Sequence, residues 1–170
     1  AMRPEFSAFR IDDLMRQIEL EFAPLATAKG IELKYVPCAL VVRSDRRLLR
    51  RLVQNLVSNA IKYTPTGRVL IGCRRKDETL RIDVYDTGVG IPETKRRDIF
   101  IEFHRLEQGA RIARGLGLGL SIVERVARVL GCTVEVNQTG GGGSHFAVTV
   151  ARSSAVPVEL PARDHTRVDP

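Results

Sequence analysis

The feature that most constrains the fold is the stretch RRLLRRLVQNLVSNAIKYT, which follows Asp45 and has the apolar spacing of one long helix. At about 100° per residue, its apolar side chains fall on one face. The residues of that face are Leu49, Val53, Leu56, Val57 and Ala60. Asp45 is suited to cap the helix, and the turn-forming sequence TPTG ends it. A helix with one apolar face packs against a second layer of structure.

The rest of the chain supplies that layer as strands. RVLIGCRR and TLRIDVYD alternate and are joined by KDE, and TVEVNQ and SHFAVTVA are joined by TGGGG, so two hairpins are predicted. IELKYV and ALVVRSD predict two shorter strands. A helix is expected from about Ile11 to a stop at Gly30, kinked or interrupted at Pro24, and another over Leu120–Leu130. The fold class is therefore α/β, a two-layer sandwich whose mixed, mostly antiparallel sheet of about five strands packs on three helices.

Composition narrows the classes of function. A chain of 170 residues with 44% hydrophobic residues can bury a core without disulfides, and Cys38, Cys73 and Cys132 are expected to be buried thiols. The three histidines lack metal-ligand spacing, and no apolar run is long enough for a membrane span. The net charge of +7 favours a polyanionic ligand or an acidic partner. Nucleic acid is disfavoured, because aromatic residues are only 5% and Trp is absent.

Polar residues line one edge of the long helix, at Asn55, Asn59 and Lys62. Asparagine is a mediocre helix former, so two of them one turn apart beside the apolar face suggest a ligand. Their amide oxygens suit Mg²⁺, and the lysine one turn further on suits phosphate. The alternative is that the asparagines bond locally and the lysine is solvated.

Two glycine-rich segments follow. In VYDTGVG a strand leads Asp86 into a turn with Gly88 and Gly90, where the carboxylate is placed to accept from an exocyclic amine such as that of adenine. The alternative is a simple Asx turn. In RGLGLGLS a long loop passes into a helix, whose free amides attract anions. The segment RGLGLGLS matches neither the Walker phosphate-binding loop nor the dinucleotide-binding fingerprint. The alternative to an anion-binding role is a flexible hinge.

Taken in order, these motifs resemble the catalytic ATP-binding domain of sensor histidine kinases, within the ATPase group that includes DNA gyrase, Hsp90 and MutL. NLVSNAIKYT resembles the N box, DTGVGI the G1 box, IFIEFHR the F box and GLGLGL the G2 box. The resemblance covers roughly residues 6–151 and implies the Bergerat fold, with ATP and Mg²⁺ as cofactors.

The family also implies a role for each matching residue. Asn59 is the expected Mg²⁺ ligand, with Asn55 beside it, and Lys62 is expected to meet phosphate. Tyr63 is expected to pack near the adenine, and the Asp86 carboxylate is expected to accept a hydrogen bond from the adenine amine. The remaining expected nucleotide-binding residues are Gly88, Gly90, Ile91, Phe103, Gly115, Leu116, Gly117, Leu118 and Gly119.

Two departures refine the expected function. ATP-hydrolysing relatives carry Glu where this chain has Asn55, so the resemblance favours phosphotransfer over hydrolysis. The family's phospho-acceptor histidine motif is absent, so the acceptor is expected on a separate dimerisation domain, and the fragment alone is not expected to autophosphorylate. Residues 1–5 are interpreted as a residual linker, 6–151 as the catalytic domain, and 152–170 as a flexible tail or linker.

The resemblance extends to partners and location. A response-regulator receiver domain is an expected partner, fused downstream in hybrid kinases, and a cytoplasmic location is expected even where the full-length protein is anchored in a membrane. The alternatives are an ATP-binding regulatory module without phosphotransfer and a serine-kinase relative.

Overall fold

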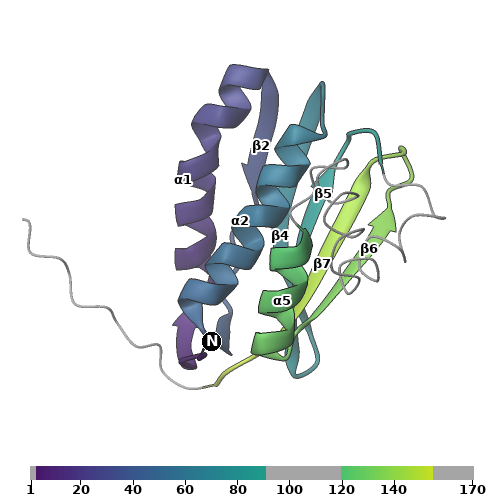
Figure 1. Ribbon diagram of the computed structural model, residues 1–170. Coiled ribbons are helices and arrows are strands. Elements are labelled where there is room, and N and C mark those ends of the chain that lie inside the picture. Colours follow the sequence, from purple (N-terminus) through teal and green to yellow (C-terminus); the bar gives the residue numbers. More distant parts are fainter. Residues whose placement is uncertain (1–2, 91–119, 155–170) are drawn as a thin grey trace, which may run out of the picture.

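The computed structural model describes residues 3–90 and 120–154 as two layers, with three helices on one face of a five-stranded sheet (Figure 1). The helices are α1 (Ile11–Lys29), α2 (Arg46–Lys62) and α5 (Leu120–Leu130). The α/β sandwich expected from the sequence is confirmed. Within the described ranges, no helix is both long and apolar enough to cross a membrane.

The sheet has the order β2-β4-β5-β7-β6. These strands are β2 (Ile31–Tyr35), β4 (Gly67–Lys76), β5 (Thr79–Asp86), β6 (Thr133–Gln138) and β7 (Ser144–Ala151). Of the strand pairs within residues 3–90 and 120–154, only β2–β4 is parallel, so the sheet is mixed and mostly antiparallel, and both predicted hairpins form. Two further strands, β1 (Ser7–Arg10) and β3 (Val41–Ser44), form a separate antiparallel pair. The backbone of Arg152 and Ser153 extends beyond β7 to pair with β3.

The core lies between α2 and the sheet. The side chains of Leu49, Leu52 and Leu56 are fully buried in one cluster with Ile71 of β4 and Ile82 of β5. Asp45 caps α2 as predicted, because its Oδ1 accepts from the backbone N–H of Leu48 at 3.0 Å. The apolar face of α2 is thus fixed on the sheet, and its polar edge is fixed with it.

Of the two outcomes expected at Pro24, an interruption of α1 does not occur, since the helix continues through Pro24 to Lys29. A proline at this position leaves the carbonyl of Leu20 without its intrahelical donor. Leu20 is 75% exposed, so water can take the place of that donor. The helix then ends at Gly30 in the left-handed conformation, as predicted.

Candidate functional site

The site is built around the carboxylate of Asp86, which ends β5 and is only 6% exposed. Its Oδ1 accepts backbone hydrogen bonds from Gly88 at 3.0 Å and from Ser144 at 3.1 Å. Among the described residues, Oδ2 accepts no hydrogen bond. Burial raises the pKa of Asp86, and the two N–H donors partly offset this rise. One carboxylate oxygen is therefore held in a fixed direction and left for a donor on a ligand.

The turn that follows Asp86 packs against the end of α2. The N–H of Val89 donates to the carbonyl of Tyr63 at 3.4 Å, and a β-carbon on Gly88 would overlap the same carbonyl oxygen. Only glycine fits this approach. The bond from Gly88 to Asp86 is itself an Asx turn, so the alternative interpretation of the motif is correct for Oδ1. Because Oδ2 stays unused within the described chain, the Asx turn and a ligand-binding role are compatible.

The β6–β7 turn is the third wall of the site. The hairpin itself was predicted from the sequence, but its contact with Asp86 was not. A β-carbon on Gly143 would overlap the carbonyl oxygen of Asp86, and one on Gly90 would overlap that of Gly142. Ser144 supplies the second donor to Asp86. The available signal was the glycine run TGGGG, which indicates close backbone approach as well as a turn.

The predicted polar edge lies along α2. Asn59 is buried at 8% exposure, Asn55 is half-buried and Lys62 is exposed. The Asn55 side-chain amide donates to the carbonyl of Arg51 at 2.9 Å, which is the local bonding considered as the alternative. That bond uses only the nitrogen, and the Asn55 Oδ1 accepts no hydrogen bond from the described residues. The ammonium of Lys62 lies 5.7 Å from the ring centroid of Tyr63, and burial raises the pKa of that tyrosine.

The side chains of Asn55 and Asn59 are suited to bind a Mg²⁺ ion that is also bound by the phosphates of a nucleotide. Within residues 3–90 and 120–154, no group of three His, Cys, Asp or Glu side chains is arranged to hold a metal ion. Amide oxygens are hard ligands, and Mg²⁺ commonly combines one or two protein oxygens with substrate phosphates and water. The donor set of Asn55 and Asn59 suits that mode of binding.

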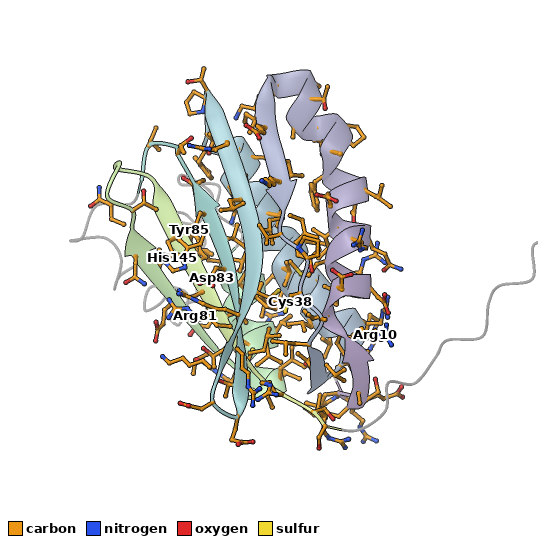
Figure 2. The ribbon with its side chains drawn as sticks, turned by 180° about the vertical axis from the view of Figure 1, so that it is seen from behind. Arg10, Cys38, Arg81, Asp83, Tyr85 and His145 are labelled. Atoms are coloured by element: carbon orange, nitrogen blue, oxygen red, sulfur yellow. The ribbon has the colours of Figure 1, made fainter. Side chains whose placement is uncertain are left out.

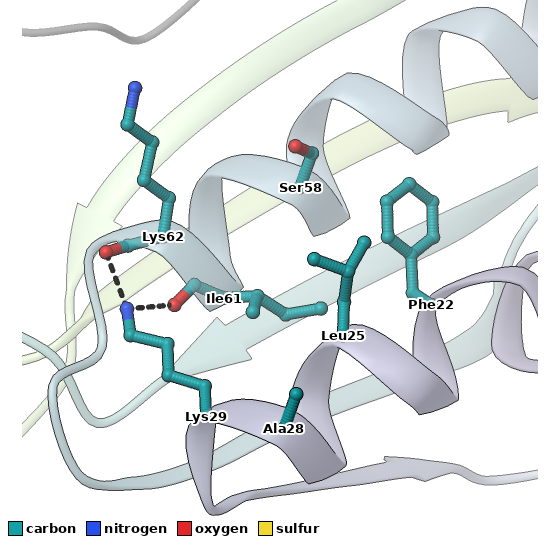
Figure 3. A pocket seen from close by; sticks show the side chains of 7 residues that line it. All are labelled: Phe22, Leu25, Ala28, Lys29, Ser58, Ile61 and Lys62. Atoms are coloured by element: carbon teal, nitrogen blue, oxygen red, sulfur yellow. Dashed lines mark hydrogen bonds between the residues drawn. The ribbon is translucent and has the colours of Figure 1, made fainter.

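A groove of about 500 Å³ lies between α1 and α2, lined by Phe22, Leu25, Ala28, Lys29, Ser58, Ile61 and Lys62 (Figure 3). Lys29 Nζ donates to the carbonyls of Ile61 and Lys62, at 2.7 Å each, and so satisfies the last turn of α2. Of the predicted site residues only Lys62 lines this groove, and its ammonium points away from it. The groove is therefore separate from the site at Asp86.

The remaining predicted site residues lie outside the described residues. These are Ile91, Phe103, Gly115, Leu116, Gly117, Leu118 and Gly119. The helix expected after the last glycine does form, because α5 begins at Leu120, which is fully buried, and packs against α2.

Comparison with known sequences gives a consistent result. Residues 44–154 match the family model described as histidine kinase-, DNA gyrase B-, and HSP90-like ATPase. The sensor histidine kinase AtsR of Burkholderia thailandensis is 40% identical over 134 residues, which cover 76% of this chain and 21% of AtsR. The chain spans between 10% and 21% of the length of the first three curated relatives.

Solved structures agree with the sequences. Full-length ShkA in complex with AMPPNP has a TM-score of 0.76 and 30% identity, over 91% of this chain and 33% of ShkA. The nucleotide-free catalytic domain of histidine kinase ThkA has a TM-score of 0.73 and 26% identity, over 87% of this chain and 96% of that domain. The fold is thus that of histidine kinase catalytic domains.

Proposed function

Because the chain belongs to the family of histidine kinase-, DNA gyrase B- and HSP90-like ATPases, we propose that it is the catalytic ATP-binding domain of a sensor histidine kinase. It binds ATP and transfers the γ-phosphate to a histidine on a separate dimerisation domain. The observation that carries the proposal is the buried Asp86 carboxylate, whose Oδ2 faces no donor among the described residues.

In this proposal the described residues divide between the two ends of the nucleotide. Asp86 Oδ2 accepts from the exocyclic amine of adenine, Gly88 and Gly90 shape the pocket, and Tyr63 packs near the base. Lys62 meets phosphate, and Asn59, with Asn55, supplies amide oxygens to Mg²⁺, which neutralises phosphate charge when it is bound. Ile91, Phe103 and the segment 115–119 complete the site, with the amides of Leu116 to Leu118 around the phosphates.

The residues of the α2 edge favour transfer to a protein acceptor over hydrolysis. Asn55 stands where a carboxylate would activate water, and an amide cannot act as a general base at neutral pH. The acceptor histidine therefore supplies the nucleophile: its ring nitrogen bonds to the γ-phosphorus, the bond to the β–γ bridging oxygen breaks, and ADP leaves. The domain contributes position and charge neutralisation.

The proposal includes the partners and location expected from the sequence. The phospho-acceptor domain belongs to the same kinase, and a receiver domain takes the phosphate onward. A cytoplasmic location is part of the proposal, because the domain would draw its ATP from the cytoplasm.

Thermal unfolding with and without nucleotide tests the proposal. ATP or ADP with Mg²⁺ is expected to raise the unfolding temperature, and Asn59→Ala is expected to remove the Mg²⁺-dependent part of that rise. Asn137→Ala, on the exposed surface of β6, is the matched control. The absence of a shift at millimolar nucleotide would contradict the proposal.

Supplying the dimerisation domain in trans then separates the candidate functions. Phosphate on its histidine supports the kinase. Tight ATP binding without transfer would instead indicate a regulatory module, and acid-stable phosphoserine on a partner would indicate a serine kinase.

A further inference from the structure

The sheet face that points away from the helices carries a charged cluster unrelated to the nucleotide site (Figure 2). Asp83, at the centre of β5, is 3% exposed and accepts three hydrogen bonds. They come from Arg81 Nε at 3.0 Å, Arg74 Nε at 3.1 Å and His145 Nε2 at 2.6 Å. The ring of His145 also stacks on Tyr85, with centroids 4.1 Å apart. The Asp83 carboxylate thus binds the guanidinium groups of both arginines and holds them in fixed positions.

The two arginines are held in a way that leaves their outer nitrogens unused. Both bind Asp83 through Nε, and within the described part of the chain the side-chain Nη atoms of Arg74 and Arg81 make no hydrogen bond. The residues are direct cross-strand partners, and like charges in that position are destabilising. One carboxylate cannot neutralise two guanidinium groups. The sheet therefore retains positive charge in a fixed geometry.

Small residues lie on both sides of Asp83, because Gly72 of β4 and Ala147 of β7 are its cross-strand partners. Glycine weakens a strand interior, and it often marks a position where another backbone approaches. Gly72 does not have a positive φ, and a β-carbon placed on it would meet no atom within 4 Å. The packing of the described chain therefore does not require this glycine, and no described residue fills the space above it.

Charge on this face favours an acidic ligand. Strand alternation places lysine and arginine in excess over carboxylates, with Lys34, Arg68, Arg74, Lys76 and Arg81 against Glu32, Asp83 and Glu135. Guanidinium groups bind carboxylates in a bidentate manner, and a prepositioned group loses less side-chain entropy on binding.

We propose that this face docks an acidic segment of a partner protein. Carboxylates of the segment bind the Nη atoms of Arg74 and Arg81, and its backbone passes over Gly72. The surface lies on the opposite side of β5 from Asp86, so docking goes beyond the proposed ATP-dependent function and does not depend on it.

Fluorescence anisotropy with a labelled hexaglutamate peptide, without nucleotide, tests the proposal. Arg74→Ala is expected to weaken peptide binding about fivefold, the upper range for one exposed ion pair. Arg75→Ala is the matched control, since Arg75 is the next residue of β4, is exposed and points to the other face. Arg75→Ala removes the same charge, but it is expected to weaken peptide binding by less than half the factor found for Arg74→Ala.

Gly72→Val provides a second variant that leaves every charge in place. Valine suits a strand, so the unfolding temperature is expected to hold or rise, while the added side chain blocks the segment and weakens binding. Equal losses for Arg74→Ala and Arg75→Ala would overturn the proposal, as would unchanged binding by Gly72→Val or no peptide binding at all. A single-stranded oligonucleotide of equal charge that binds more tightly, with the same dependence on Arg74, would assign the face to nucleic acid instead.

Discussion

The replacement Asp86→Asn tests adenine recognition, because the structure fixes how the new side chain must lie. Oδ1 accepts from two backbone N–H groups, so the amide oxygen of asparagine has to take that place. The amide NH₂ group then occupies the position of Oδ2. The NH₂ group of the asparagine is a hydrogen-bond donor, whereas the Asp86 Oδ2 that it replaces is an acceptor. It would then face the adenine amine, which is also a donor.

The magnitude follows from the lost hydrogen bond. A hydrogen bond to a charged group contributes about 1.5–3 kcal/mol, and the opposed donors place the loss in the upper half of that range. The dissociation constant for ATP is therefore expected to rise about 40- to 140-fold, given that about 1.4 kcal/mol is a factor of ten. The guanine O6 can accept from the new NH₂ group, so the preference for ATP over GTP is expected to shrink as well.

Isothermal titration calorimetry with ATP and GTP measures both effects, and thermal unfolding verifies that the variant is folded. Burial raises the pKa of Asp86, so the folded state binds a proton more readily than the unfolded chain. This contribution to stability is greatest below the usual aspartate pKa and is lost as pH rises through the raised value. At neutral pH, Asp86→Asn is thus expected to leave the unfolding temperature unchanged or raise it.

Asp83→Asn is the control, because Asp83 is a buried carboxylate of the same strand on the opposite face. It is expected to destabilise the fold by weakening three hydrogen bonds and to leave the ATP affinity unchanged. An unaltered ATP affinity in a folded Asp86→Asn variant would refute the assignment of this carboxylate to adenine.

Three further predictions follow from described contacts. Gly143→Ala places a β-carbon on the carbonyl of Asp86, so it is expected to lower both the unfolding temperature and the ATP affinity in the same two assays. Lys29→Met removes two hydrogen bonds to the last turn of α2 and is expected to cost about 1–2 kcal/mol in urea unfolding, whereas Lys34→Met on the exposed side of β2 is expected to cost little. The pKa of Asp86 is raised, so its carboxylate becomes protonated at a higher pH than that of an ordinary aspartate. As the pH is lowered, ATP affinity is therefore expected to begin to fall at that higher pH, and calorimetry across the acid range measures this.

Local patterns predicted the elements that carry strong periodicity. The apolar face of α2 and the alternation in β4 to β7 gave those elements with ends within a few residues of the structure. The local rule for Pro24 did not separate a kink from an interruption, because the outcome depends on whether water can reach the freed carbonyl of Leu20, a residue that is 75% exposed. β1 was missed because its four residues adjoin α1 without a break and are held by β3, more than thirty residues away.

The candidate site was only partly predictable, for the same reason. Asp86 and Gly88 belong to one short motif, so their hydrogen bond is local and was visible as a possible Asx turn. The donor from Ser144 and the close approach of Gly143 depend on the β5–β7 register, which no motif in the sequence specifies. The same register brings His145 and Arg74 to Asp83, so the outer cluster could not be predicted from β5 alone.

β5 contributes side chains both to the site at Asp86 and to the outer cluster at Asp83. Its period of two directs Leu80, Ile82, Val84 and Asp86 toward the helices, and Arg81, Asp83 and Tyr85 toward the outer face. The strand is paired along its length with β4 on one side and β7 on the other, which holds both sets of side chains in register. Among the described residues, Asp83 and Asp86 share no hydrogen-bond partner, so substitutions at the two positions act on separate contacts. A change at Asp83 that altered ATP affinity would therefore have to act through the backbone of β5 itself.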